Sequence, residues 1–222
     1  MKLSYRIEGD TCIIEDGVTK IGRREANQIK GEFTRLVFPD TLISIGESAF
    51  RYSNLLFKSI QFPDSLTDIG ANAFSYCSEL ESVIIPGTVT SIGKDAFIGC
   101  GMLNRVTIQN GVKVIKNGAF CGCPSLTEVY IPCSVEKYGR YAFRKMYFKD
   151  LYLSDDPSRY GPFVSAFESG YFGGASKHHA QLFHELGLSK DIIEITLHVP
   201  QGTETDYKTH PFFGKFAKVE IR

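Results

Sequence analysis

The stretch "VIIPGTVTSIGKDAFIGC", Val83 to Cys100, is one copy of a pattern that the chain repeats. Its Ala-Phe pair returns at steps of 23 or 24 residues. The pairs are Ala49-Phe50, Ala73-Phe74, Ala96-Phe97, Ala119-Phe120, Ala142-Phe143 and a divergent copy, Ala166-Phe167. A fixed period of this length is the signature of stacked repeat units, and it takes precedence over any shorter motif.

Each copy contains a short strand that a proline ends. The segment "LESVIIP" from Leu80 alternates apolar and variable positions, as do the segments that begin at Phe33, Phe57, Leu103, Leu126 and Phe148. Alternation with β-branched residues predicts a strand with one buried side. Proline has no N–H for a ladder, so we expect the strand to stop there.

The second half of each copy predicts another extended piece followed by a turn. The pieces read "LISIG", "LTDIG" and "VTSIG", and we expect their glycines, Gly46, Gly70 and Gly93, to adopt a positive φ. The Ala-Phe pair then sits in a turn or a single helical coil, where the ring fills the space between two walls. Since one repeat cannot bury its apolar side alone, the repeats must stack into a solenoid with a parallel sheet on one wall.

The repeat resembles the BspA-like leucine-rich repeats of bacterial surface antigens, written L-x-x-I-x-L-P-x-x-V-x-x-I-G-x-x-A-F-x-x-C. "LESVIIPGTVTSIGKDAFIGC" agrees at nearly every fixed position, and the resemblance covers Phe33 to Met146. It implies an α/β-type leucine-rich-repeat horseshoe of short parallel β-strands with turns or short helical coils, capped at both ends. For function it implies adhesion or host interaction at the surface of a Bacteroides-type bacterium, or after secretion.

We expect a single leucine-rich-repeat solenoid domain over residues 1–222. "SYRIEGDTCII" predicts a hairpin that turns at Gly9-Asp10 and covers the first coil. The tail is similar to the family's closing segment, with Tyr207, Phe213 and Phe216 over the last coil. The expected parts are an N-terminal cap with an eroded repeat (1–32), regular repeats (33–153), an irregular insertion with a degenerate repeat and a short helix (154–194), and a C-terminal strand and cap (195–222).

Composition and charge narrow the classes of partner. The 25 basic residues balance 25 acidic ones, which argues against nucleic acid or a membrane surface. No apolar run approaches the ~20 residues of a membrane span. The start, "MKLSYRIEGDTCIIEDG", has no apolar core of a signal peptide. We therefore expect a cytoplasmic protein if this start is native, against the surface location that the resemblance implies.

The cysteines are interpreted as structural. Cys77, Cys100 and Cys123 occupy one repeat position and predict an inward ladder of free thiols, which behave as small apolar residues. A metal site at Cys121, Cys123 and Cys133 is the alternative. A structural zinc site needs four ligands at recognisable spacing, which this set lacks, so we expect no metal.

No catalytic motif is found. "KHHAQLFHELG" holds His178, His179 and His184 but lacks the second histidine of H-E-x-x-H, and it predicts instead a short helix capped by Ser176. "GYFGGASK" does not have the glycine and lysine order of a phosphate-binding loop. We expect neither an enzyme nor a cofactor.

The exposed side of the sheet is where function is expected. Residues two and four before the proline position point to solvent. The first row is Val37, Gln61, Ile84, Thr107, Tyr130, Tyr152 and His198, and the second is Arg35, Ser59, Ser82, Arg105, Glu128, Asp150 and Thr196. The predicted binding residues are Arg105, Glu128, Tyr130, Asp150 and Tyr152, because tyrosine and arginine dominate interface hot spots. Tyrosines that are simply good strand formers on a wet face are the alternative.

Three functions remain open. The first is a non-catalytic protein-binding module, a monomer that uses the exposed face of the sheet, with a glycan as a second choice of ligand. The second is a structural or assembly solenoid without a specific ligand. The third is an enzyme that uses the 154–194 segment.

Overall fold

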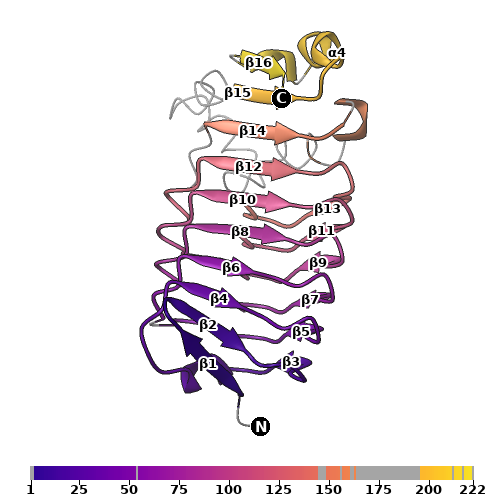
Figure 1. The fold of residues 1–222 in the computed structure, drawn as a ribbon. Helices are drawn as coiled ribbons and strands as arrows, with labels where there is room; N and C mark the ends of the chain where they lie inside the picture. Colours follow the sequence, from indigo (N-terminus) through magenta and orange to yellow (C-terminus); the bar gives the residue numbers. More distant parts are fainter. Residues whose placement is uncertain are drawn as a thin grey trace.

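The computed structural model describes residues 3–53, 55–144, 149–155, 157–160, 163, 196–211, 213–216 and 218–221. Within these residues the chain winds into a solenoid with two walls of short strands (Figure 1). A ten-stranded wall, here the front sheet, faces the viewer, and a six-stranded wall, here the side sheet, runs beside it. The fold class predicted from the repeat is confirmed.

The front sheet carries one strand from each coil. It consists, in spatial order, of β1 (Tyr5–Glu8), β2 (Thr11–Ile14), β4 (Arg35–Val37), β6 (Ser59–Gln61), β8 (Ser82–Ile85), β10 (Arg105–Ile108), β12 (Glu128–Ile131), β14 (Asp150–Leu153), β15 (Thr196–Val199) and β16 (Lys218–Ile221). All neighbours pair in parallel except β1 and β2, which form an antiparallel hairpin through the predicted turn. Proline follows the inward residue that ends β8 or β12, as the alternation predicted.

The side sheet is built from the second extended piece of each copy. Its strands are β3 (Lys20–Ile21), β5 (Ser44–Ile45), β7 (Asp68–Ile69), β9 (Ser91–Ile92), β11 (Val114–Ile115) and β13 (Lys137–Tyr138). Helical structure in the described residues is short: η1 (Glu25–Gln28), η2 (Pro157–Tyr160), α4 (Glu204–Thr209) and η3 (Phe213–Lys215).

The Ala-Phe pairs among the described residues lie in turns, which decides for them between the two forms that the sequence left open. The turns are tied coil to coil by main-chain bonds such as Phe74 N–H to Ala96 C=O at 2.7 Å and Phe97 N–H to Ala119 C=O at 2.8 Å. These bonds make a third ordered wall. Each repeat is therefore held to the next at three places around the coil.

The phenylalanines of these turns form the centre of the core. Phe74, Phe97 and Phe120 are fully buried, as predicted. Their rings stack in a column, with centroids 5.3 Å apart from Phe74 to Phe97 and again from Phe97 to Phe120. This distance is close to the ~4.8 Å between neighbouring strands, so one ring per coil fills the interior without gaps.

The expectation of a positive φ at the Ile-Gly glycines is wrong. Gly46, Gly70 and Gly93 are not among the residues with positive φ. A Cβ on Gly93 would instead lie 2.4 Å from the carbonyl carbon of Gly70, and one on Gly70 would lie 2.7 Å from that of Gly46. Glycine is required here because consecutive coils approach each other too closely for any side chain.

The predicted cysteine ladder is present. Cys77, Cys100 and Cys123 are buried, and their thiols donate to the carbonyl oxygens of Phe50, Phe74 and Phe97 at 3.2 to 3.3 Å. Burial raises the pKa of Cys77 to about 12. The neighbouring thiols and burial also raise the pKa of Cys100, so Cys77 and Cys100 stay protonated at neutral pH.

Aromatic side chains cover the C-terminal end of the core. Tyr207 and Phe213 are fully buried, Phe216 nearly so, and the Tyr207 hydroxyl donates to the Asp155 carbonyl. The cap over the last coil thus contains the predicted rings. The division of the chain into four parts stays a prediction, since Ala166-Phe167, the expected helix, His178, His179 and His184 lie outside the described residues.

Candidate functional site

The outward rows of the front sheet align across the strands. Tyr130 pairs with Tyr152, and Tyr152 with His198, while Arg105 pairs with Glu128 and Glu128 with Asp150. The structure therefore places all five predicted binding residues next to one another, on β10, β12 and β14. They lie in the C-terminal half of the front sheet (Figure 1).

Three stacked rings make a raised strip, here the aromatic ridge: Tyr130, Tyr152 and His198. The centroids of Tyr130 and Tyr152 are 3.9 Å apart, and those of Tyr152 and His198 are 4.2 Å apart, with 9° between the planes in each pair. The three side chains stand on adjacent strands with their edges toward solvent, since all three residues are partly exposed. Stacking restricts the rotamers of the three rings.

Charged groups run beside the aromatic ridge. Arg105 contacts Oε2 of Glu128 through Nε and Nη2, both at 2.8 Å. His198 Nε2 lies 2.8 Å from Asp150 Oδ1, and His198 Nδ1 lies 3.6 Å from Glu220 Oε2. Glu128 thus accepts two hydrogen bonds from one guanidinium, and Asp150 has the His198 ring within hydrogen-bonding distance.

The environment of Tyr152 changes its acidity. Partial burial, a hydrogen bond with Tyr130 and the negative charges of Asp150 and Glu128 together raise the pKa of Tyr152 to about 12. The phenol is therefore neutral at physiological pH. It can donate or accept a hydrogen bond at an interface.

Sequence reasoning placed His198 in the row but left it, and Glu220, out of the site. The front sheet runs directly from β14 to β15, although 42 residues separate Leu153 from Thr196 in the chain. The sequence feature that could have added His198 to the site is its position in "TLHVP". The histidine falls two residues before a proline, as Tyr130 does. β16 then adds Glu220 opposite His198.

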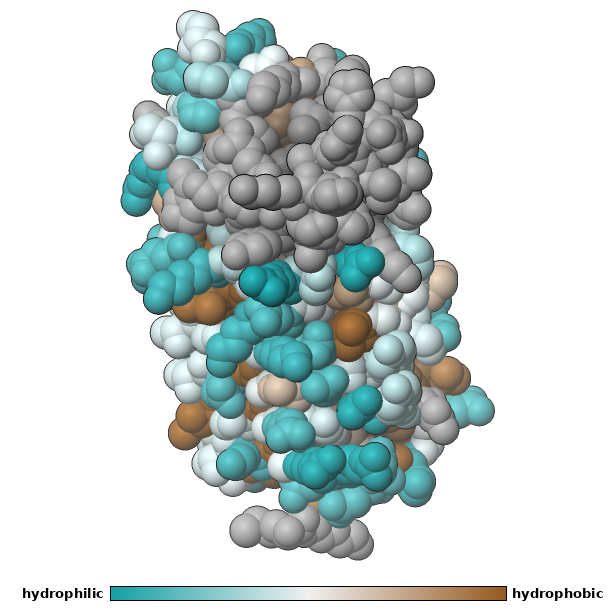
Figure 2. Space-filling view, turned by 180° about the vertical axis from the view of Figure 1, so that it is seen from behind, coloured by the Kyte–Doolittle hydropathy of each residue, from teal (hydrophilic) through white to brown (hydrophobic). Residues whose placement is uncertain are grey.

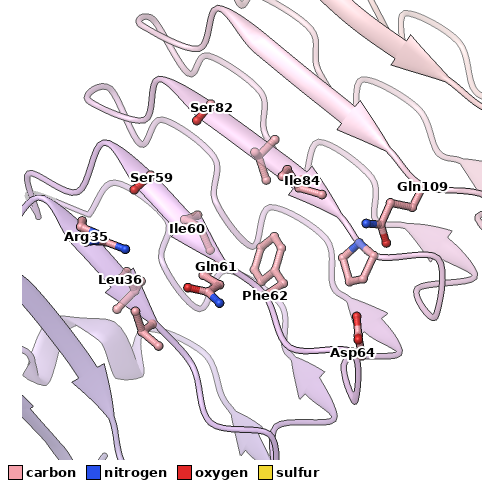
Figure 3. A pocket seen from close by; sticks show the side chains of 13 residues that line it. Arg35, Leu36, Ser59, Ile60, Gln61, Phe62, Asp64, Ser82, Ile84 and Gln109 are labelled. Atoms are coloured by element: carbon pink, nitrogen blue, oxygen red, sulfur yellow. The ribbon is translucent and has the colours of Figure 1, made fainter.

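The N-terminal half of the same face is hollowed instead of raised. A cavity of about 400 Å³, here the hollow, opens over β4, β6 and β8 (Figure 3). Its outward-facing lining includes Arg35, Val37, Ser59, Gln61, Ser82 and Ile84, with Phe62, Asp64 and Gln109 at the end where the strands stop. The sequence placed these residues in the outward rows but did not predict a cavity.

Two features account for the hollow. Ser59 and Ser82 lie opposite each other and leave the backbone uncovered, and pairing between β6 and β8 extends no further than Ile60 with Val83. Phe62 occupies the position that Ile85 and Ile108 have in later coils, and it stacks on Phe38 at 5.8 Å while staying half-buried. We attribute the opened pairing beyond Ile60 to this larger ring.

Other surfaces of the described residues also carry exposed apolar groups. Figure 2 shows the opposite side, where described hydrophobic groups appear in small separate areas among hydrophilic ones. On the turn wall Tyr52 and Tyr76 stack at 4.7 Å and are 55% and 43% exposed. Within the described residues, no cluster of three or more His, Cys, Asp or Glu could hold a metal ion, and no helix is long and apolar enough to span a membrane.

The parallel walls, the repeated Phe turns and the outward rows define a leucine-rich-repeat solenoid. The model of the BspA type leucine-rich repeat region matches six copies over residues 12–149. The chain belongs to this family, as its repeat predicted. No significant match is found among curated protein sequences.

Solved structures share the fold. A leucine-rich repeat protein from Bacteroides ovatus is 21% identical with a TM-score of 0.53, covering 94% of this chain and 54% of its own. The pneumococcal vaccine antigen PcpA is 21% identical with a TM-score of 0.52, covering 68% and 48%. The T. pallidum leucine-rich repeat protein is 24% identical with a TM-score of 0.50, covering 78% and 97%. The match thus spans about half the length of two of these proteins.

Proposed function

We propose that this protein is a non-catalytic protein-binding module whose partner contacts the exposed face of the front sheet, with Tyr130 and Tyr152 as anchors. The role is of the adhesion or host-interaction type that the family resemblance implies. The single observation that carries the proposal is the stacked row of Tyr130, Tyr152 and His198, flanked by charged side chains that pair with one another.

The energetics of such a surface support a protein partner. Aromatic anchors on a rigid support contribute most of the binding energy at interfaces, and flanking charges contribute orientation and selectivity. Arg105, Glu128 and Asp150 make contacts within the protein, which reduces the side-chain freedom that they would lose on meeting a partner. A balanced net charge does not favour nucleic acid as the ligand.

The test begins with a partner captured by affinity purification and identified, followed by titration against variants. Tyr130→Ala and Tyr152→Ala should each weaken binding by about 30-fold or more, the effect of losing an anchor tyrosine. Arg105→Ala should change affinity less than about fivefold, since the group is solvent-exposed. The matched control is Tyr76→Ala, which removes one ring of a stacked, exposed tyrosine pair on the turn wall.

Two results would contradict the proposal. The first is unchanged affinity in both folded ridge variants, and the second is equal loss of affinity in the Tyr76→Ala control. If the purified protein instead forms oligomers that Tyr130→Ala dissociates, the front sheet is an assembly surface, which is the alternative function. We expect a monomer in sedimentation experiments.

A further inference from the structure

The hollow has opposite charges at its two ends. Arg35 stands at the start of β4, and Asp64 lies just beyond the end of β6, and Figure 3 shows them at opposite ends of the cavity. Both residues are exposed, and among the described residues neither takes part in an ion pair. The carboxylate of Asp10 lies near Arg35 and accepts hydrogen bonds from the Thr11 and Thr34 hydroxyls, so it offsets part of the Arg35 charge without an ion-pair contact to it. The two ends can therefore receive opposite charges from a ligand.

The space between the charges is partly apolar. Ile84 is 53% exposed at one side, and the half-buried Val37 and Phe62 contribute further apolar surface. The floor is formed by Ser59 and Ser82. Gln61 adds an amide group where β6 ends, and an amide can bind both the N–H and the C=O of a peptide unit. Gln109 Oε1 already accepts from the Gly87 N–H at 3.2 Å, so Gln109 offers its NH2 group as a donor.

The length of the hollow fits an extended peptide. Ser59 pairs with Arg35, and five residues of chain lead from Ser59 to Asp64, a span of at most about 17 Å. In an extended peptide, residues i, i+2 and i+4 point to the same side, and i and i+4 are about 13 Å apart. Flexible Lys and Glu side chains cover the remaining distance.

We propose that the hollow binds an extended segment of the partner protein that carries a basic residue and an acidic residue four positions apart, with a small aliphatic residue midway. The basic side chain pairs with Asp64 and the acidic side chain with Arg35. The aliphatic side chain lies against Ile84 above Ser59 and Ser82. This inference rests on the proposed function, because it assigns a second contact region for the same partner on the same face.

A peptide is favoured over a glycan by two observations. Sugar rings are recognised by stacking on free aromatic faces, and the aromatic ring of the hollow, Phe62, already stacks on Phe38. The full charges at both ends also match a peptide with two charged side chains better than a neutral sugar.

The experiment uses isotope-labelled full-length protein and synthetic pentapeptides blocked at both ends. Acetyl-Lys-Ala-Val-Ala-Glu-amide and its reverse, acetyl-Glu-Ala-Val-Ala-Lys-amide, cover both chain directions. At least one should shift the amide signals of Ser59, Gln61 and Ile84 in a saturable way and leave that of Tyr152 unchanged. A Gln-Ala-Val-Ala-Gln peptide and a Lys-Val-Glu peptide serve as controls for charge and spacing, and both should bind more weakly.

Variants assign the binding to the two charges. Arg35→Gln and Asp64→Asn should each weaken binding about two- to fivefold, as expected for exposed charge pairs. Ser82→Phe should remove detectable binding, because the ring occupies the hollow. Arg140→Gln is the matched control, since it removes an exposed arginine from the turn after β13, outside the front sheet, and should have no effect.

The inference is overturned if neither peptide binds, if the neutral peptide binds equally well, or if maltotetraose shifts the same signals while the peptides do not. It is also overturned if both charge variants bind the peptide like the parent. Peptide binding is measured without the captured partner, so its failure leaves the test of Tyr130 and Tyr152 intact. Failure of the ridge variants likewise leaves the peptide result standing.

Discussion

The aromatic ridge and the hollow lie on the same face of the same sheet. Stacked rings cover the sheet at the ridge, whereas small side chains leave a cavity at the hollow. In the ridge, Tyr130 and Tyr152 stack on strands β12 and β14, which pair over four residues. In the hollow, Ser59 and Ser82 face each other on β6 and β8, which pair over two. The repeat determines the positions of the outward side chains. The size of these side chains and the number of residues over which adjacent strands pair determine whether the surface is filled or hollow.

This comparison distinguishes the buried core that supports the front sheet from the outward side chains that give each region its chemical character. Both regions rest on the same column of phenylalanines and on coils tied together at three walls. Outward positions do not contribute to that column, so they can vary without loss of the fold. The predictions below test whether substitutions in the core and substitutions of outward side chains have separate effects.

The largest expected effect comes from the shared support. Phe97→Ala should lower the free energy of unfolding by about 3 to 5 kcal/mol, because it leaves a cavity in a fully buried column. Thermal unfolding followed by circular dichroism measures the loss. Amide signals of Gln61 and Tyr152 should disappear together in one transition. Separate transitions for the two regions would show that the face is not a single rigid surface.

The spacing of the coils is the next target. Gly93→Ala should destabilise the protein by about 1 to 3 kcal/mol, since its Cβ would lie 2.4 Å from backbone atoms of Gly70. The control is Gly101→Ala, where an added Cβ meets no atom within 4 Å and φ is not positive. Equal stability of both variants in denaturant titrations would contradict the close approach of the coils.

A smaller effect is expected at the strand between the two regions. Arg105→Ala on β10 should change stability by less than about 1 kcal/mol, because the Arg105–Glu128 pair is exposed and screened. Denaturant unfolding at low and high salt checks this value. A loss above 2 kcal/mol would mean that the charged row belongs to the support and not only to the surface.

The smallest effect concerns the ridge alone. Asp150→Asn removes a negative charge beside Tyr152, and because that charge disfavours the phenolate, the pKa of Tyr152 should fall from about 12. An ultraviolet absorbance titration of the variant and parent, each compared with its Tyr152→Phe derivative, gives the shift. Asp64→Asn in the hollow should leave the titration unchanged. An unchanged Tyr152 in Asp150→Asn would contradict the described electrostatic contact.

The repeat made much of this fold predictable. Alternation before each proline identified the strands, and the fixed phase of Tyr130, Tyr152 and Arg105 placed them in neighbouring rows, as the register shows. Buried positions of Phe74 and Cys100 followed from the same periodicity, because a residue that recurs once per coil occupies the same place in each.

Features that depend on contacts between coils were not predictable. A glycine in the sequence does not reveal whether it serves φ or a close neighbour, so the role of Gly93 was misjudged. The hollow arises from the absence of large side chains at Ser59 and Ser82 and from a pairing that stops at Ile60, and neither leaves a motif. His198 was left out of the predicted site because an irregular stretch of 42 residues separates Leu153 from Thr196 in the chain.

The coils stack in register, so the front sheet sets a fixed distance between any two regions of its surface. The hollow over β6 and β8 and the ridge over β12 and β14 are separated by whole strands, so their distance can change only in steps of about 4.8 Å. Deleting one period, residues 101–123, would bring β8 next to β12 and shorten the distance by one step. A partner that touches both regions would then lose one contact while each region alone stayed intact, so gain or loss of a repeat would select among partners by length.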